Sequence, residues 1–339
     1  MPSETNNAIG SGIANSCEGE SRRACAVFAG MDVLACKGVH LQGDGFVLSR
    51  SEAYELRQMR AESRKHIRPF CSAPDIIKHP QGRWVIDLFG LTEAEVQYRF
   101  PRIYWHLFRT VKPERDVRSR RSPVNSWWLH SDPRPKLREA ITGKKRYIVT
   151  AEKMKHRAFQ FVDASTLPDA RVVAIASESA ALLSLLSSKF HILWASHAAH
   201  LNKQGEYCSS RCFSGFPFHS VSNAYFSRLE ELGERLDEWQ KELQIQNPKA
   251  GIGRMYSEVE AYRQRRQSTK FTTNKPIGRS ALLLAEVLDE IDVTTAEALC
   301  VPRHMKNREI LDFLIDLSGS DAKSRTEFFL DTRDDCRIT

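Results

Sequence analysis

The residues of this chain that are best placed to do chemistry are cations. Between Arg99 and Arg157 the sequence holds seventeen Lys or Arg residues against five Asp or Glu, whereas the whole 339-residue chain carries a net charge of only +8. The rest of the chain is therefore net acidic, and the positive excess is confined to one block. Concentrated positive charge is typical of a surface that binds a polyanion. The chemistry we expect is ion pairing and hydrogen bonding, with no catalytic residue.

Phosphate groups and base edges of nucleic acid are bound by different side chains. Cations hold phosphates and fix the register, while Arg, Asn and Gln read base edges in the major groove. The expected phosphate contacts are cations clustered within the block: Arg115, Arg118, Arg120, Arg121, Lys144, Lys145, Lys153, Lys155 and Arg157. The base-edge candidates, chosen by residue type and loop position, are Asn125, Arg134 and Asn202, with Arg120 and Arg121 suited to either role.

Trp127 and Trp128 follow a charged stretch, residues 114–125, that is predicted to be an exposed loop or an arm that orders on a ligand. Aromatic rings can stack on extruded or single-stranded bases. Two adjacent tryptophans more commonly fill the core beneath a loop, and we favour that interpretation here.

The cysteines and histidines do not predict a metal site. Cys208 and Cys212 have CxxxC spacing but no second Cys or His pair nearby, whereas structural zinc sites use four ligands in paired clusters. His191, His197 and His200 share one helical stretch without a carboxylate or cysteine beside them. We therefore expect no metal.

The elements that must position these residues are predicted from capping signals and hydrophobic periodicity. Capping boxes begin helices at Ser49 and Thr92, and Pro101 begins a third helix that is predicted to end at residues 112–113. Further helices are predicted at residues 135–141, 178–199, 222–247, 251–266, 280–291 and 308–317. Strands are predicted at residues 45–48, 83–89, 146–150, 158–163, 171–176 and 212–218. This order predicts an α+β (mixed α/β) domain followed by an α-helical C-terminal extension.

Eleven short phrases run in order between residues 67 and 218: IRPF (67–70), WVIDLFGL (84–91), FP (100–101), VKPERD (111–116), NSWWL (125–129), PRPKLR (133–138), RYIVT (146–150), KHR (155–157), IAS (175–177), LSSKFH (186–191) and RCFSGFPF (211–218). Together they resemble the target-recognition domain of MmeI-like enzymes, which are bacterial restriction-modification proteins related to type IIG and adenine-N6 DNA methyltransferases. The resemblance implies sequence-specific recognition of double-stranded DNA by a cytoplasmic bacterial protein. It continues into the helix that begins at Ser222 and is lost after Arg266.

Two stretches depart from the family's pattern. The family usually has Pro-Arg after the threonine at position 150, and this chain has Ala151-Glu152, which replaces a cation by an anion. After Trp194 the family tends toward Gly-rich loops, whereas this chain has Ala-Ser-His-Ala-Ala-His at residues 195–200. A phosphate contact directly after Thr150 is therefore not expected here.

The catalytic motifs of the family are missing from the sequence. There is no Pro-Pro pair of the kind that holds a flipped adenine, and no Gly-rich loop in the strand-to-helix setting that binds S-adenosylmethionine. We therefore expect no cofactor in this chain; S-adenosylmethionine, and Mg where DNA is cut, are implied for a complete family member. The expected partners are double-stranded DNA and a separate methyltransferase subunit or domain, and the chain is interpreted as a fragment of such an enzyme.

The predicted organisation has five parts. Residues 1–25 are polar and predicted to be disordered, 26–67 form a lead-in segment, 68–220 form the target-recognition domain, 221–318 form the helical segment, and 319–339 are a polar tail. No apolar run approaches the roughly 20 residues of a membrane-spanning helix. Two other functions stay open: a protein-interaction module with a basic face, and a complete enzyme with an unrecognised site.

Overall fold

Two four-stranded sheets occupy the middle of the described chain, which comprises residues 33–118, 126–200, 206–218, 221–246, 251–267, 279–302 and 305–319 of a computed structural model. The first sheet is antiparallel and has the order β1 (Ala35–Lys37), β8 (Val172–Ile175), β5 (Arg146–Ala151) and β6 (Gln160–Asp163). The second has the order β2 (Val47–Leu48), β4 (Trp84–Ile86), β3 (Ile67–Cys71) and β7 (Leu167–Pro168). In the second sheet β3 and β7 are parallel and the other pairs are antiparallel.

Helices connect and cover these sheets. Those of the first half are α3 (Arg50–Met59), α4 (Ser63–His66), α5 (Ala73–Ile77), α6 (Glu93–Arg99), α7 (Pro101–Thr110), α8 (Lys112–Arg118) and α9 (Pro135–Ile141). Those of the second half are α10 (Ala180–Ser187), α11 (Lys189–His200), α12 (Phe226–Gln246), α13 (Ile252–Gln267), α14 (Arg279–Ala298) and α15 (Asn307–Leu317). Short turns are η1 (Asp44–Phe46), the π-helical η3 (Ser209–Ser214) and η5 (Asn223–Tyr225).

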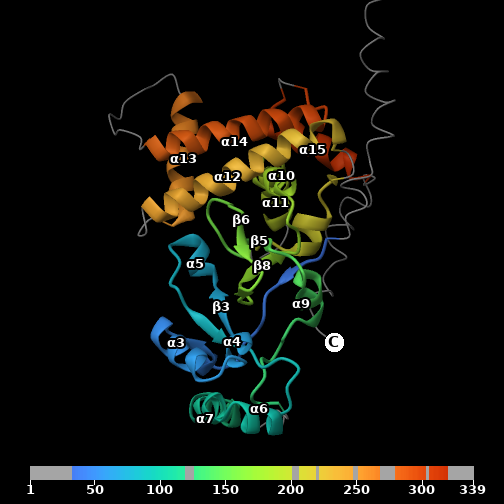
Figure 1. Cartoon of the computed structure of the whole chain (residues 1–339). Coiled ribbons are helices and arrows are strands. Elements are labelled where there is room, and N and C mark those ends of the chain that lie inside the picture. Colours follow the sequence, from blue (N-terminus) through green and yellow to red (C-terminus); the bar gives the residue numbers. More distant parts are fainter. Residues whose placement is uncertain are drawn as a thin grey trace, which may run out of the picture.

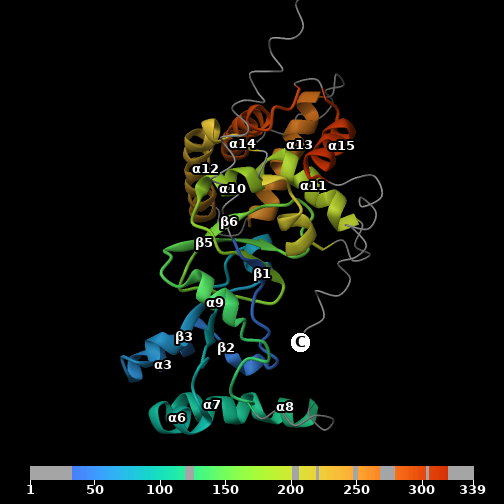
Figure 2. The same cartoon turned by 90° about the vertical axis from the view of Figure 1, so that its right-hand side faces the viewer.

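The elements are stacked along one long direction (Figures 1 and 2). Helices α12 to α15 form one end, α10 and α11 lie beneath them, and the sheet that contains β5 follows. The second sheet comes next with α3 and α4, and α6, α7 and α8 form the opposite end. The two ends of the molecule are therefore built from the C-terminal helices and from the N-terminal half of the cationic block.

Strand β5 shows why the first sheet is covered on both faces. Successive side chains of a strand point to opposite faces. Ile148 belongs to the core that includes α10 to α15, whereas Tyr147 and Val149 belong to a second core with Ile76 of α5 and other residues. All three are fully buried, so this strand is a near-continuous apolar run instead of an alternating one.

The helical segment shares its core with the sheet domain. The largest cluster of buried residues includes Phe159 and Val173 from the sheet region together with Leu232, Leu284 and Leu314 from the C-terminal helices. Helix α12 packs along α10, and α10 is buried along its whole length. The extension is thus packed on its own sheet domain.

Most predicted elements are confirmed. The α+β class, both capping boxes, the start of α7 at Pro101 and the three strands around β5, β6 and β8 are all present. The long helix predicted at 222–247 is present as η5 followed by α12, and the helix predicted at 280–291 continues to Ala298.

Two local predictions are wrong. Residues 212–218 were expected to form a strand, but the helical turn η3 extends to Ser214 instead. This turn packs against α11 and buries Cys212 and Phe213. The charged stretch 114–125 was expected to be a loop, but α8 reaches Arg118, because Pro113 sits in its first turn, where proline is tolerated. Residues 119–125 lie outside the described structure, as do the predicted disordered segment and all but the first residue of the predicted tail.

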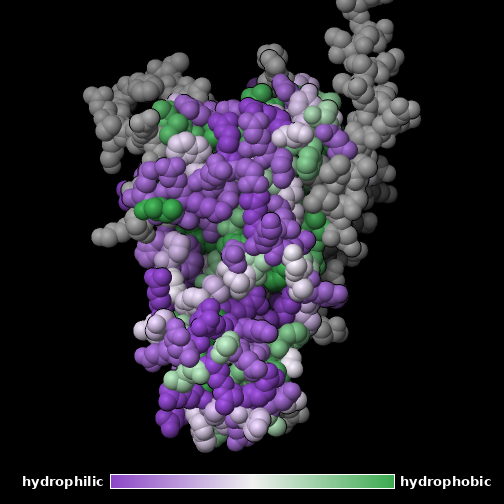
Figure 3. All heavy atoms as spheres, in the orientation of Figure 1, coloured by the Kyte–Doolittle hydropathy of each residue, from purple (hydrophilic) through white to green (hydrophobic). Residues whose placement is uncertain are grey.

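The surface carries few apolar features on the face seen in Figure 3. The side chains over the helical end are predominantly hydrophilic, and hydrophobic residues gather in a hollow between that end and the lower lobe. Within the described residues, no helix is both long and apolar enough to cross a membrane.

Candidate nucleic-acid interface

The exposed lysines of the predicted phosphate set lie at the two ends of β5. Lys144 and Lys145 precede the strand, and Lys153 and Lys155 follow it. Lys145, Lys153 and Lys155 are exposed and Lys144 is half-buried. A six-residue strand spans roughly 20 Å. The structure therefore divides these four cations into two groups.

The group after β5 is mixed in charge. Lys37 of β1 pairs with the Glu152 carboxylate, and the Lys37 Nζ lies 4.0 Å from Glu206 Oε2. Lys153 Nζ lies 3.0 Å from Glu206 Oε1. Lys155 makes no ion pair with a described residue. Part of the positive charge at this end of the strand is thus already neutralised.

Arg115 does not have the predicted phosphate role in this structure. It is 1 % exposed, and its guanidinium donates to the carbonyl oxygens of Leu41 (2.7 Å), Gln42 (2.8 Å) and Ser126 (3.2 Å). Burial lowers its pKa. A guanidinium that is buried and held by three backbone carbonyls does not lie at the surface where a phosphate would bind, so Arg115 instead fixes the turn before η1 to α8. Sequence position could not show this burial, because the adjacent Glu114 and Asp116 are half-buried and exposed.

Arg157 is also directed inward. Its guanidinium donates to Thr150 Oγ1 (3.2 Å), to the Ala151 carbonyl and to the Glu152 carbonyl (3.3 Å). It stacks on the Tyr207 ring at 4.9 Å. These contacts direct the guanidinium inward, so a phosphate contact at the outer surface does not fit this arrangement.

Of the three base-edge candidates, the structure describes only Arg134. Arg134 donates to the Gly38 carbonyl (3.2 Å) and pairs with Asp132 (3.2 Å), in a backbone conformation with φ of 54°. Asn125 and Asn202 lie outside the described residues, as do Arg120 and Arg121, and the side chain of Arg118 is likewise not described. Their predicted roles stay predictions.

The tryptophan pair fills the core, as favoured. Trp127 is 7 % exposed and its Nε1 donates to Glu93 Oε1 at 3.1 Å. Trp128 Nε1 donates to the Leu91 carbonyl at 2.9 Å. Trp127 is therefore buried in the core, and Trp128 is half-buried against it. Both indoles anchor the segment between β4 and α6.

A second cationic face was missed by sequence reasoning. On α7, Arg102 and Arg109 are exposed and flank Trp105, which is 49 % exposed. Their i, i+3 and i+7 spacing puts them on one side of the helix. The signal was the helical spacing of these three residues in the sequence.

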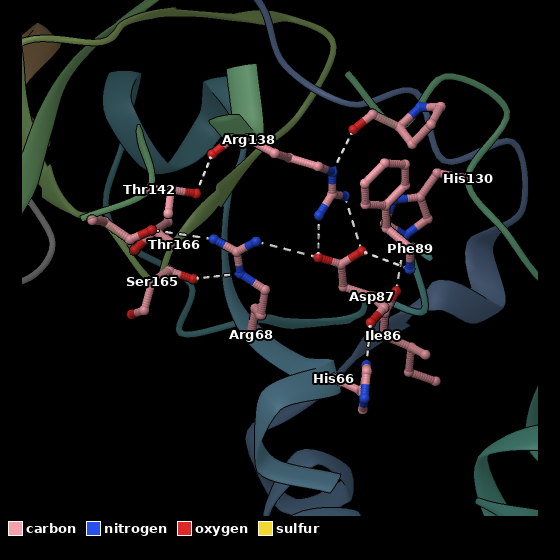
Figure 4. A network of polar contacts seen from close by, with 12 residues as sticks. His66, Arg68, Ile86, Asp87, Phe89, His130, Arg138, Thr142, Ser165 and Thr166 are labelled. Atoms are coloured by element: carbon pink, nitrogen blue, oxygen red, sulfur yellow. Dashed lines mark hydrogen bonds and ion pairs between the residues drawn. The ribbon is translucent and has the colours of Figure 1, made fainter. Parts of the chain in front are cut away.

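Helix α9, which precedes the turn with Lys144 in the chain, is held by a buried carboxylate (Figure 4). Asp87, which follows β4, accepts two hydrogen bonds from Arg138 of α9, at 2.6 and 2.9 Å. It also accepts one from Arg68 of β3 at 3.2 Å. Arg68 in turn donates to the carbonyls of Ala164 and Ser165. One carboxylate therefore joins β4, β3, α9 and the connection between β6 and β7.

The electrostatics of this network are set by burial and by arginine. Burial alone would raise the pKa of Asp87, but the hydrogen bonds and charge of Arg138, aided by His130 and Arg68, hold that pKa below its usual value. Burial lowers the pKa of neighbouring His130 to about 4. Its Nε2 lies 2.8 Å from the Ile86 carbonyl, which identifies it as the protonated ring nitrogen of a neutral imidazole.

This arrangement predicts acid sensitivity. The pKa of His130 is about 4 in the folded state and about 6.5 in an unfolded chain. The unfolded state therefore binds more protons between these values, and stability falls as the pH drops from 6.5 toward 4. We expect a slope of about 1.4 kcal/mol per pH unit from this residue. Urea titrations between pH 7 and 5 measure it, and the slope should shrink in His130→Gln.

His191 adds to the same trend, since burial lowers its pKa to about 3. A His130→Gln variant with the full wild-type slope would contradict the assignment of a neutral buried imidazole to His130.

His191 lies beside Tyr207, with its Nε2 3.0 Å from the Tyr207 hydroxyl. Among the described residues, no three His, Cys, Asp or Glu side chains are grouped so that they could hold a metal ion.

Comparison with known proteins identifies the family. The model of the MmeI target recognition domain matches residues 33–220, which is more than half of the chain. The chain therefore belongs to the family of proteins that carry this domain. No curated protein matches.

A solved structure supports the same fold. It is that of the Type IIL restriction-modification enzyme MmeI in complex with DNA, which is 14 % identical in sequence with a TM-score of 0.51. The match covers 84 % of this chain and 35 % of that one. It therefore extends beyond residues 33–220 into the helical segment, while the matched part is about a third of the MmeI chain.

Proposed function

We propose that this chain is a recognition module that binds double-stranded DNA in a sequence-specific manner. The observation that carries the proposal is the match of residues 33–220 to the MmeI target recognition domain. The fold likeness to MmeI in its DNA complex supports it. The exposed cations at both ends of β5 supply the positive charge that phosphate contacts need.

In this proposal, the catalytic part of a complete restriction-modification enzyme lies in another domain or subunit. The chain corresponds to 35 % of the MmeI chain, and its own sequence has no methyltransferase motif. We infer that a separate methyltransferase domain or subunit supplies S-adenosylmethionine chemistry, and Mg where DNA is cut. The proposal also places the chain in the bacterial cytoplasm, where such enzymes meet DNA.

Equilibrium binding to duplex DNA tests the proposal. Fluorescence anisotropy with a labelled mixed-sequence duplex, its single strands and an RNA duplex should show preference for double-stranded DNA. Equal affinity for the three nucleic acids, or affinity for none, would contradict it. Preference for an acidic protein over DNA would instead support the interaction-module alternative.

The salt dependence of binding tests the two lysines before β5. In Lys144→Ala/Lys145→Ala, the slope of log Kobs against log salt should become shallower by about 0.9 for each lysine that contacts a phosphate. A control that removes two charges from the C-terminal helices, Arg228→Ala/Arg254→Ala, should leave the slope unchanged. An unchanged slope in the lysine variant would show that this end of β5 does not contact DNA.

A further inference from the structure

A cavity of about 440 Å³ lies where the sheet domain meets the helical segment. Its walls come from the loop after β5, from α10 and α11, and from α13 and α14 of the helical end. These helices lie together above the sheet in both views of the molecule (Figures 1 and 2). Cavities of this size are within the range of small-molecule sites in proteins, roughly 300–1,000 Å³.

The walls combine an apolar side with a polar side. The apolar side is formed by Met154, Ile192, Ala195, Val259 and Leu288. The polar side carries the hydrogen-bond donors Lys155, Arg157, Ser187 and Arg263, and Glu260 is the acid among the lining residues. A ligand that fits must therefore have a flat or compact apolar part and an anionic part.

Arg157 places an uncompensated charge beside this cavity. It makes no ion pair with a described residue, and all the acceptors of its guanidinium are neutral. Burial lowers its pKa. Arg157 is half-buried, and these acceptors use three of the five N–H donors of its guanidinium. A partly desolvated cation is stabilised by an anion near it. The adjacent lysine, Lys155, is exposed and adds a second free positive charge at the rim.

A further polar atom along the wall has no hydrogen-bond partner among the described residues. Arg263 Nε is buried without such a partner, while its Nη2 lies 2.7 Å from Asp289 and 3.1 Å from Asp292. The Ser187 hydroxyl, which is 3 % exposed, interacts with the Tyr256 hydroxyl. The two aspartates neutralise Arg263 and hold it in place, so Lys155 and Arg157 supply the free charge. Buried polar atoms in proteins are nearly always paired, which points to an occupant that supplies acceptors.

We propose that this cavity binds a nucleotide unit, with its phosphate toward Lys155 and Arg157 and its base against the apolar wall. Glu260, which already accepts a hydrogen bond from Gln264 at 3.1 Å, is available to accept another from a sugar hydroxyl. The nucleotide can be a free mononucleotide or a residue of a bound DNA strand, because the recognising chemistry is the same. The DNA-strand source rests on the proposed function, and the free-nucleotide source does not.

Calorimetric titration of the full chain with 5′-mononucleotides and with inorganic phosphate tests the proposal. We expect mononucleotides to bind more tightly than phosphate, and Lys155→Glu to weaken them at least tenfold. Lys65→Glu, an exposed charge reversal on α4 and outside the cavity lining, should leave mononucleotide affinity unchanged. Absence of mononucleotide binding, or equal affinities in Lys155→Glu and Lys65→Glu, would overturn the proposal.

Competition with duplex DNA distinguishes the two sources. If saturating DNA displaces the mononucleotide, the cavity takes a nucleotide of the bound strand. If DNA and mononucleotide bind together, the cavity takes a free nucleotide. Since the titration without DNA is scored separately, loss of mononucleotide binding overturns the cavity assignment, whereas loss of DNA binding alone overturns only the proposed function.

Discussion

Replacement of Asp87 by asparagine is expected to lower the free energy of unfolding by about 3–5 kcal/mol, the usual range for breaking a buried ion pair. The carboxylate is 5 % exposed and accepts hydrogen bonds from two arginines. Without its charge, Arg68 and Arg138 would be two close cations with no buried anion. The effect should be large because four parts of the fold meet at this residue (Figure 4).

Urea denaturation of Asp87→Asn against the wild type at pH 7 measures this effect. Asp116→Asn is the matched control, since Asp116 pairs with Lys112 at 2.8 Å but is 59 % exposed. Exposed pairs contribute only about 0–1 kcal/mol. Because the pKa of Asp87 is lowered on folding, its contribution is present above the unfolded carboxyl pKa and is lost as the pH falls below it. Equal unfolding midpoints for the two variants at pH 7 would contradict the network.

Substitution of Gly233 by alanine is expected to destabilise the protein, although the same change in an exposed helix stabilises it by up to about 1 kcal/mol. A Cβ at this position of α12 would lie 1.9 Å from the Ala180 carbonyl oxygen. The two helices are also joined by hydrogen bonds from Ala181 N to Glu230 (2.6 Å) and from Ser184 Oγ to the Leu229 carbonyl (2.6 Å). Relief of the clash requires these backbones to separate, and we expect a loss of about 1–3 kcal/mol or more.

Thermal and urea unfolding of Gly233→Ala measure this reversal of sign. Glu238→Ala, at an exposed position of the same helix, should change stability by less than about 0.5 kcal/mol. A Gly233→Ala variant as stable as the wild type would show that the helical segment is not packed on α10 as described.

Local signals in the sequence predicted much of the fold. Ser49 and Thr92 each form the expected capping box, because such a box needs only residues three positions apart. Strand β5 was predicted because its apolar run is short and bounded by charges. Helix α8 and the turn η3 were not predicted, because the tolerance of Pro113 in a first turn depends on its exact position and burial against α11 depends on neighbours distant in sequence.

The candidate interface was predicted less well than the fold. Lys145 and Lys155 are exposed as expected, but in the same charge block Arg115 is buried and Arg157 is half-buried, and both guanidinium groups donate to backbone carbonyls. Sequence cannot separate these cases, because charge counting treats every arginine alike and does not show which ones face backbone acceptors. The Asp87 network was likewise invisible, since Arg68, Asp87 and Arg138 are separated by 19 and 51 residues.

Selection of the purified chain on a random-sequence DNA duplex pool, followed by sequencing, at two salt concentrations tests whether this chain recognises a DNA sequence. We expect one sequence motif to be enriched at both salt concentrations, with weaker overall binding at the higher one, because base contacts specify sequence while phosphate contacts carry the salt dependence. Binding that disappears at the higher salt concentration without enrichment of any motif would contradict it, and would leave a cationic surface without sequence recognition.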